Sequence, residues 1–240
     1  GATVGASLVA DPHVQGVLFT GSTEVARQLQ RTLAARLTAA GAPVPLIAET
    51  GGQNAMVVDS SALAEQVVGD ALVSAFDSAG QRCSALRLLC VQQELAGRVV
   101  AMLEGAASEL RIGDPRRLAS DVGPVIDADA RAGIERHVAA MQSRGRRVWR
   151  APLPAGLQGH FVAPTLIEID DVAELEREVF GPVLHVLRYR REALPRVLAA
   201  IGATGYGLTQ GVHTRVDETV AQVVHGTRAG NVYVNRNIVG

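Results

Sequence analysis

Short runs rich in valine, isoleucine and leucine alternate along the chain with longer segments in which apolar residues recur every third or fourth position. The short runs predict β-strands at residues 14–20, 44–48, 55–59, 86–92, 147–149, 161–169, 183–189, 208–213 and 231–235. The longer segments predict helices at residues 23–40, 62–79, 94–109, 128–143, 192–201 and 216–227. Strands that alternate with helices of this length predict an α/β fold, with right-handed crossovers between parallel strands.

The segment Glu-Thr-Gly-Gly at residues 49–52 interrupts the strand pattern, and we place a domain boundary there. Residues 1–48 form one strand–helix–strand unit, which is too small to bury both of its faces. Residues 49–240 are long enough for an α/β domain of the usual size. Because the chain begins at Gly1 without a methionine and ends directly after a predicted strand, we expect it to be a piece of a longer protein.

The composition excludes several classes of protein. Of the 240 residues, 48% are hydrophobic and 20% are charged, which excludes intrinsic disorder. No apolar run reaches the ~18 residues that a membrane span needs, and the net charge of −1 argues against a general nucleic-acid-binding protein. Two cysteines are too few for a disulfide framework, which favours a reducing, cytoplasmic compartment.

Several catalytic and binding motifs are absent from the sequence. All 23 basic side chains are arginines, which excludes a Schiff-base lysine and a P-loop lysine within these residues. No histidine has the spacing of a metal-binding motif, so we expect no metal site. The sequence also lacks the G-x-S-x-G motif of serine hydrolases and the G-x-G-x-x-G fingerprint of dinucleotide binding.

Cys83 is the first candidate for chemistry. It lies directly after Arg82, at a glycine-marked junction between the helix predicted at 62–79 and the strand predicted at 86–92. A nearby positive charge at such a junction can activate a cysteine as a nucleophile. Cysteine is also one of the most commonly buried residue types, so a structural role stays open. We expect Cys90, inside an apolar strand, to be structural.

Two polar segments follow the first two predicted strands. Glu49 leaves its strand beside two glycines, where a carboxylate can face a cleft and act as a general base; a solvated turn residue is the alternative. Residues 21–24 (Gly-Ser-Thr-Glu) open the first predicted helix, whose N-terminal N–H groups can hold a phosphate. A capped βα turn, with Ser22 or Thr23 as the N-cap, explains the same residues without a ligand.

Two charged segments have simple structural explanations. Residues 176–182 (Glu-Arg-Glu-Val-Phe-Gly-Pro), taken alone, predict a helix end that runs into a turn. Residues 144–150 combine four arginines with the one tryptophan, which suggests nucleic-acid binding. A single tryptophan in a nearly neutral chain favours a solvated edge instead.

Taken in order, five short motifs resemble the aldehyde dehydrogenase superfamily. They are Phe-Thr-Gly-Ser (19–22), Glu-Thr-Gly-Gly (49–52), Gly-Gln-Arg-Cys (80–83), Glu-Val-Phe-Gly-Pro (178–182) and Asn-Val-Tyr-Val-Asn (231–235). Residues 49–55 and 74–85 further resemble the proline utilisation A branch, bacterial bifunctional enzymes of proline breakdown. The resemblance implies the end of a Rossmann-type NAD domain, residues 1–48, followed by an α/β catalytic domain, residues 49–240, truncated at its C-terminal end.

The aldehyde dehydrogenase half of that branch oxidises L-glutamate γ-semialdehyde, formed from Δ1-pyrroline-5-carboxylate, to glutamate with NAD. The resemblance implies that Cys83 is the nucleophile, which carries the thioacyl intermediate. It implies that Glu49 activates the water that hydrolyses this intermediate.

The resemblance also implies contacts with the cofactor and the substrate. The implied NAD-binding residues are Gly21 and Ser22 at the pyrophosphate, Gly51 and Phe180 near the nicotinamide, and Glu178 at the nicotinamide ribose. The hydroxyl of Ser84 would hold the substrate carboxylate, and Phe76 would line the aliphatic part of the substrate.

We expect the parent enzyme to be cytoplasmic and homo-oligomeric, to act on a small-molecule aldehyde, and to carry FAD in a separate proline dehydrogenase domain. The chain lacks the superfamily's oxyanion-hole asparagine and the earlier Rossmann strands, so we expect it to be inactive alone and to self-associate through an exposed strand edge. Three alternatives stay open. They are another member of the superfamily, such as an acylating relative without the base glutamate; a non-catalytic folded fragment; and a cysteine hydrolase, although no motif links a histidine to Cys83.

Overall fold

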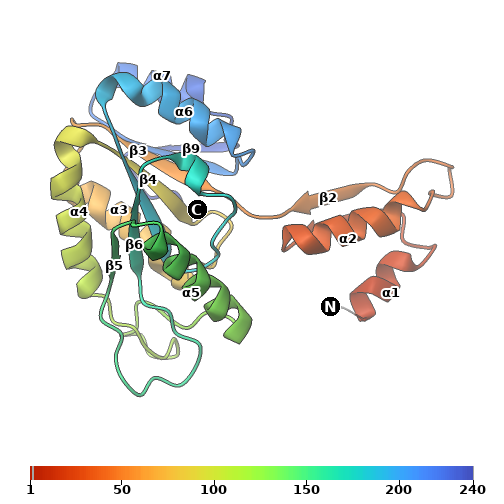
Figure 1. Ribbon diagram of the computed structural model, residues 1–240. Coiled ribbons are helices and arrows are strands. Elements are labelled where there is room, and N and C mark those ends of the chain that lie inside the picture. The colour runs from red at the N-terminus through yellow and green to blue at the C-terminus, as the bar shows by residue number, and fades with distance from the viewer. Residues whose placement is uncertain (2, 240) are drawn as a thin grey trace. The chain divides into compact units, whose positions relative to one another are not determined.

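Residues 1–51 form a unit of their own in the computed structural model, which describes residue 1 and residues 3–239. The unit contains helices α1 (Val4–Ala10) and α2 (Thr23–Ala34) and strands β1 (Val17–Thr20) and β2 (Leu46–Glu49) (Figure 1). The two strands pair in parallel, with Thr20 opposite Glu49. Ser22 is the N-cap of α2, because its Oγ accepts a hydrogen bond from the N–H of Val25 at 3.3 Å.

The strands predicted at 14–20 and 44–48 begin at Val17 and Leu46, and the helices differ more from the prediction. The second helix ends at Ala34 and not at residue 40, because the chain then makes a tight turn in which the N–H of Thr38 donates to the carbonyl oxygen of Ala42. Gly41 adopts a φ of +77° in this turn. The helix α1 was not predicted; it buries none of its residues, so no apolar stripe marks it in the sequence.

Within the described part of residues 52–240, a seven-stranded sheet has the strand order β5-β6-β7-β4-β3-β8-β9. Its strands are β3 (Asn54–Val58), β4 (Leu86–Gln92), β5 (Val148–Arg150), β6 (Thr165–Ile169), β7 (Val183–Tyr189), β8 (Thr209–His213) and β9 (Asn231–Val234). Neighbouring strands pair in parallel, except that β5 runs antiparallel to β6.

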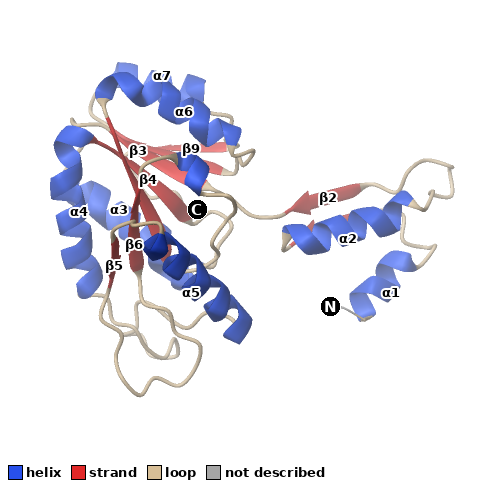
Figure 2. Cartoon of the chain, in the orientation of Figure 1, coloured by secondary structure: helices blue, strands red, loops and turns tan. Residues whose placement is uncertain are grey.

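Helices cover both faces of this sheet (Figures 1 and 2). The α-helices are α3 (Ala64–Phe76), α4 (Gln93–Ser108), α5 (Ala128–Ser143), α6 (Leu194–Ala203) and α7 (Asp217–Gly226), and short 3₁₀ segments lie at Asp77–Gly80, Val172–Glu174 and Arg191–Ala193. α3 packs against α4, and α6 packs against α7. Right-handed crossovers place these two pairs on opposite faces, because β3 leads to β4 in one direction and β7 to β8 in the other.

The central strands carry the hydrophobic core. Every residue of β3 and β4 is buried, which explains their almost continuous apolar sequence. Cys90 lies on β4, where burial raises the pKa of its thiol, as a structural cysteine requires. Polar side chains are also enclosed among the apolar ones, among them Arg87 on β4, which is 0% exposed, and His185 on β7, which is 1% exposed.

The sequence predicted β4, α5 and β7 with the correct ends, and the largest overextensions in this unit are those of β6 and α3. The strand predicted at 161–169 begins only at Thr165, directly after Pro164, which lacks the N–H that a strand interior uses. The helix predicted at 62–79 ends at Phe76, because the next residues turn into the left-handed region of φ/ψ space.

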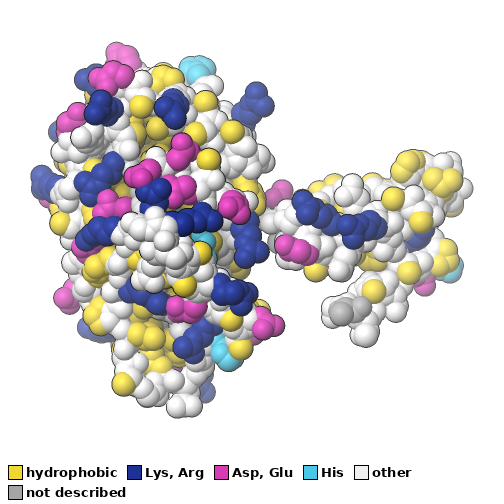
Figure 3. All heavy atoms as spheres, in the orientation of Figure 1, with side chains coloured by type: hydrophobic (Ala, Val, Ile, Leu, Met, Phe, Trp, Pro, Cys, Tyr) yellow, Lys and Arg dark blue, Asp and Glu magenta, His cyan; other side chains and the backbone are white. Residues whose placement is uncertain are grey.

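The arginines of residues 144–150 are paired with carboxylates from neighbouring segments. Arg150 forms two hydrogen bonds with Glu135, at 2.7 and 2.9 Å, and Arg146 contacts Asp170 and Glu174. Figure 3 shows the same mixture of acidic and basic side chains across the visible face of this unit. These contacts favour the solvated edge over a nucleic-acid surface. No helix of the described residues combines the length and hydrophobicity needed to cross a membrane.

Candidate active site

Cys83 follows an unusual backbone turn between α3 and β4. Ser78, Ala79 and Gly80 have φ values of 55°, 54° and 66°, so three consecutive residues adopt the left-handed conformation. This conformation costs roughly 1–2 kcal/mol for each non-glycine residue. Gly80 is required for a second reason, because a β-carbon there would lie 2.2 Å from the carbonyl oxygen of Gly181. The turn therefore brings the cysteine loop against the segment that precedes β7.

Asn54 holds the backbone of the cysteine loop. Its Nδ2 donates to the carbonyl oxygens of Cys83 at 2.6 Å and Ala85 at 2.9 Å, and its Oδ1 accepts from the N–H of Thr209 at 3.1 Å. The register of the sheet explains this position, because Asn54 lies opposite Leu86 at the beginning of the paired strands β3 and β4. The Asn54 side chain is buried, whereas Cys83 is partly exposed, as a reactive thiol requires.

Glu178 lies in the segment before β7, where it meets a buried arginine. Nε and Nη2 of Arg87 donate to Glu178 Oε1 at 3.1 and 2.9 Å, and the N–H of Gly52 donates to Oε2 at 3.2 Å. Burial raises the pKa of the Glu178 carboxyl above its ordinary value, although the charge of Arg87 acts in the opposite direction. Burial likewise lowers the pKa of Arg87, against the opposing effect of Glu178. Phe180 remains 45% exposed beside them, with its ring centroid 5.3 Å from Arg87 Cζ.

Two glutamines fix the segments that meet at this place. Nε2 of Gln53, a buried side chain, donates to the carbonyl oxygens of Leu175 and Arg177, just ahead of Glu178. The side chain of Gln81 bridges the cysteine loop to residues 124–126, with Oε1 accepting from the N–H of Ile126 at 2.8 Å. Cys83 and Glu178 are therefore set by side chains that sequence reasoning did not assign to the site.

The signal that could have revealed Arg87 and Asn54 is their position in the sequence. Both stand at or beside the beginning of apolar runs that form fully buried strands. A polar residue in such a run must find partners inside the protein, because an unpaired buried polar group is costly.

The remaining predicted site residues of this unit are Ser84 and Phe76. Ser84 follows Cys83 and is partly exposed, and its carbonyl oxygen accepts from the hydroxyl of Thr209 at 3.5 Å. Phe76, at the end of α3, is 1% exposed and packs in the hydrophobic core. The ring therefore has almost no surface from which to contact a ligand in this structure, and its contact with the substrate stays a prediction.

Residues 1–51 hold the other predicted site residues: Gly21, Ser22, Glu49 and Gly51. The N–H of Gly21 donates to the carbonyl oxygen of Glu49 at 3.1 Å, which joins the end of β1 to the end of β2. The Glu49 side chain is exposed, and Gly51 adopts a φ of +123° that favours glycine. Cys83 and Glu178 belong to the other unit, which begins at Gly52. The predicted site residues are therefore distributed over both units.

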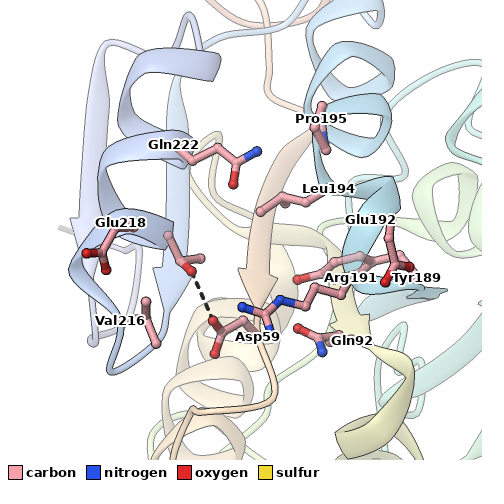
Figure 4. A pocket seen from close by; sticks show the side chains of 11 residues that line it. Asp59, Gln92, Tyr189, Arg191, Glu192, Leu194, Pro195, Val216, Glu218 and Gln222 are labelled. Carbon is pink, nitrogen blue, oxygen red and sulfur yellow. Dashed lines mark hydrogen bonds between the residues drawn. The ribbon is translucent and has the colours of Figure 1, made fainter.

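A separate cavity of about 440 Å³ lies at the opposite ends of the strands (Figure 4). It is lined by Asp59 after β3, Gln92 at the end of β4, Tyr189 at the end of β7 and residues of α6 and α7. Asp59 accepts hydrogen bonds from Thr219 and from other hydroxyls (dashed line in Figure 4). Burial raises the pKa of the Asp59 carboxyl, but these hydrogen bonds outweigh it and hold the pKa below its ordinary value. Cys83 and Glu178 precede the amino ends of β4 and β7, so this cavity is not part of their site.

The profile of the aldehyde dehydrogenase family matches residues 1–240. The chain is 62% identical, over 246 residues, to the bifunctional protein PutA of Escherichia coli (strain K12); the match covers 100% of this chain and 19% of that protein. It is 58% identical to the bifunctional protein PutA of Rhizobium meliloti, over 99% of this chain and 19% of that protein. The chain thus spans about one fifth of the length of these curated relatives.

Solved structures give the same result. A crystal structure of bifunctional proline utilization A matches 99% of this chain and 24% of that chain, with a TM-score of 0.93 and 53% identity. A 1-pyrroline-5-carboxylate dehydrogenase from Thermus with bound NAD matches all of this chain and 46% of that chain, with a TM-score of 0.89 and 31% identity. These matches confirm the predicted α/β fold of the aldehyde dehydrogenase type and the resemblance to the proline utilisation A branch.

Proposed function

Because this chain belongs to the aldehyde dehydrogenase family, we propose that it supplies the cysteine loop and part of the cofactor site of an enzyme that oxidises L-glutamate γ-semialdehyde to glutamate with NAD. The observation that carries the proposal is the partly exposed Cys83, on a loop that Asn54 and Gly80 hold in place. The similarity to proline utilization A and to a 1-pyrroline-5-carboxylate dehydrogenase supports this substrate and a role in proline catabolism.

In this proposal Cys83 performs the covalent step. Its thiolate attacks the aldehyde carbon, and a C–S bond forms while the carbonyl π electrons move to oxygen. The backbone N–H of Cys83 donates to the resulting oxyanion. When bound, NAD supplies the acceptor for the hydrogen and the two electrons that leave this carbon. The product on the enzyme is then a thioester of Cys83.

Glu49 acts in the second half of the reaction. Its carboxylate takes a proton from water, and the oxygen of this water forms a bond to the thioester carbon. The C–S bond then breaks, which releases glutamate and returns the Cys83 thiolate. A glycine-rich segment follows Glu49, and the φ of +123° at Gly51 shows that this backbone needs glycine.

The described residues fit NAD at several points. The Glu178 carboxylate is held by Arg87 and Gly52 and retains acceptor capacity on Oε2 for a ribose hydroxyl. The exposed ring of Phe180 can pack beside the nicotinamide, and Gly51 is also proposed to lie near the nicotinamide. Ser22 and its neighbour Gly21 begin α2, where free N–H groups favour a phosphate.

Ser84 selects the substrate in this proposal, because its hydroxyl donates to the substrate carboxylate. Phe76 supports the aliphatic part of the substrate. The complete protein is proposed to be a cytoplasmic homo-oligomer that also carries FAD in a proline dehydrogenase domain, and the isolated chain is proposed to be inactive.

The test is the variant Cys83→Ala in the complete protein, assayed for NADH formation with Δ1-pyrroline-5-carboxylate. We expect loss of NADH formation with NAD binding retained. Cys90→Ala is the matched control, because Cys90 is buried on β4 and should leave turnover essentially unchanged. Wild-type turnover by Cys83→Ala would refute the assignment of the nucleophile.

A further inference from the structure

Arg87 is enclosed at the junction of two loops. Its side chain is 0% exposed and it makes four hydrogen bonds: two to Glu178 Oε1, one from Nη1 to the carbonyl oxygen of Gly181 at 3.1 Å, and one from Nη2 to the carbonyl oxygen of Arg82 at 3.1 Å. Gly181 follows Glu178, whereas Arg82 directly precedes Cys83. One guanidinium therefore joins the cysteine loop to the segment that carries Glu178.

The arrangement leaves one place on Glu178 for an additional donor. Oε1 already accepts two N–H groups of Arg87, and within the described residues Oε2 accepts only the N–H of Gly52. The Glu178 side chain is 11% exposed, so it is mostly enclosed but not sealed from solvent, and Oε2 keeps acceptor capacity for one more donor. Rotation of the carboxylate would break the paired hydrogen bonds with Arg87, which are charge-assisted and directional.

We propose that Arg87 is a positioning residue. It holds the Glu178 carboxylate so that Oε2 accepts a ribose hydroxyl of NAD, and it fixes the position of this carboxylate relative to the Cys83 loop. The inference rests on the proposed function, in which Glu178 binds the nicotinamide ribose. A lysine could not replace Arg87, because a single ammonium group cannot reach both loops with the fixed fork geometry of a guanidinium.

The groups around the pair support this role. The backbone carbonyl oxygen of Arg87 accepts a hydrogen bond from Nδ1 of His185, whose Nε2 lies 2.8 Å from Nε2 of His137 on α5. A carbonyl oxygen only accepts, so Nδ1 of His185 carries a proton and its Nε2 accepts from His137. Among the described residues, Glu178 is the only carboxylate that forms a hydrogen bond with the Arg87 guanidinium.

The test is a double-mutant cycle on the dissociation constant of NAD in the complete protein. Its variants are R87K, E178Q and R87K/E178Q. We expect R87K and E178Q each to weaken NAD binding by about tenfold or more, since each disturbs a hydrogen bond to a charged group. We expect the double variant to bind within about twofold of E178Q alone, because Arg87 acts through Glu178. R150K is the matched control, since it alters an exposed bidentate pair with Glu135 and should leave NAD affinity unchanged.

A structural role would give another result. If Arg87 only stabilises the fold, R87K would bind NAD as the wild type does once folded, or the two losses would multiply in the double variant; either result overturns the inference. Should R87K fail to fold, R87M/E178Q removes both charges, which a folded protein tolerates better than the loss of one partner. We expect this variant to bind NAD as weakly as E178Q, and tenfold weaker binding than E178Q would overturn the inference.

The proposed function and the inference fail in different ways. A wild-type protein that neither binds nor reduces NAD would refute the proposed function and, with it, the inference. A wild-type protein that binds NAD, together with an R87K variant of equal affinity, would refute only the role of Arg87.

Discussion

The backbone of Gly52 packs against the carbonyl oxygen of Cys83, so closely that a β-carbon at Gly52 would lie 2.4 Å from that oxygen. The N–H of the same glycine donates to Glu178 Oε2. Gly52 thus touches the backbone of the proposed nucleophile and the carboxylate of the proposed ribose ligand. The second glycine of the Glu-Thr-Gly-Gly motif is needed for this close approach, since only glycine leaves room for the carbonyl.

The variant Gly52→Ala should impair catalysis more than folding. The added carbon must displace the Cys83 carbonyl or the Asn54 side chain, whose nearest atoms would be 2.7 Å away. A displacement near 1 Å at a reacting group can cost about 10²-fold in rate, so we expect kcat to fall by about tenfold to a hundredfold. Gly69→Ala is the control, because a β-carbon there meets nothing within 4 Å on α3 and should leave kcat unchanged. Equal rates for both variants would contradict the prediction.

The variant Glu49→Gln should separate the two halves of the reaction. Hydride loss from the substrate does not need this carboxylate, whereas hydrolysis of the thioester does. We expect a burst of about one NADH per active site, followed by a slow steady state. The measurement is rapid-mixing absorbance at saturating NAD. A steady-state rate equal to that of the wild type would show that another base activates the water.

The variant Ser84→Ala should discriminate between substrates. A hydrogen bond to a charged group is worth ~1.5–3 kcal/mol, so kcat/KM for glutamate semialdehyde should fall by roughly tenfold to a hundredfold. Simple uncharged aldehydes, which lack the carboxylate, should be affected much less. Equal losses on both kinds of substrate would mean that Ser84 supports the cysteine loop and does not bind the carboxylate.

His185 should make the folded chain sensitive to acid. Complete burial, reinforced by the neighbouring His137, lowers the pKa of His185 to about 3, and burial also lowers the pKa of His137. Between the ordinary histidine pKa of about 6.5 and this value, the unfolded chain binds a proton that the folded chain excludes. The free energy of unfolding should therefore fall as the pH falls from about 6.5 towards 3, by up to ~1.4 kcal/mol per pH unit for one histidine.

Urea unfolding of this chain at pH 7 and pH 5 measures that effect. The variant His185→Asn keeps a donor for the carbonyl oxygen of Arg87 and removes the titrating group, so its stability should change less between the two pH values. His225→Asn, on the exposed face of α7, is the control and should behave as the wild type. A wild-type chain with the same stability at both pH values would contradict the prediction.

The sequence alone was sufficient to identify the family and to predict the α/β fold and most of the helices and strands. β4, β7 and α5 were predicted with correct ends because their apolar patterns are long, and because turn residues or polar segments bound them. Ser22 was among the two predicted N-cap residues because capping depends on neighbours within three positions. The five motifs pointed to Cys83 and Glu178 because the spacing of residues within each motif is local.

The tertiary structure alone decided how these motifs are held. The partner of Arg87 is 91 residues away, and Asn54 reaches the carbonyl of a cysteine 29 residues later. The left-handed conformation of Ser78 and Ala79 contradicts local preference, and the next residue, Gly80, lies so close to the backbone of Gly181 that it has no room for a β-carbon. Such contacts depend on the order of strands in the sheet, which brings the beginnings of β3, β4 and β7 together. A buried polar side chain shows in the sequence only that it needs a partner, and the folded sheet determines which partner it finds.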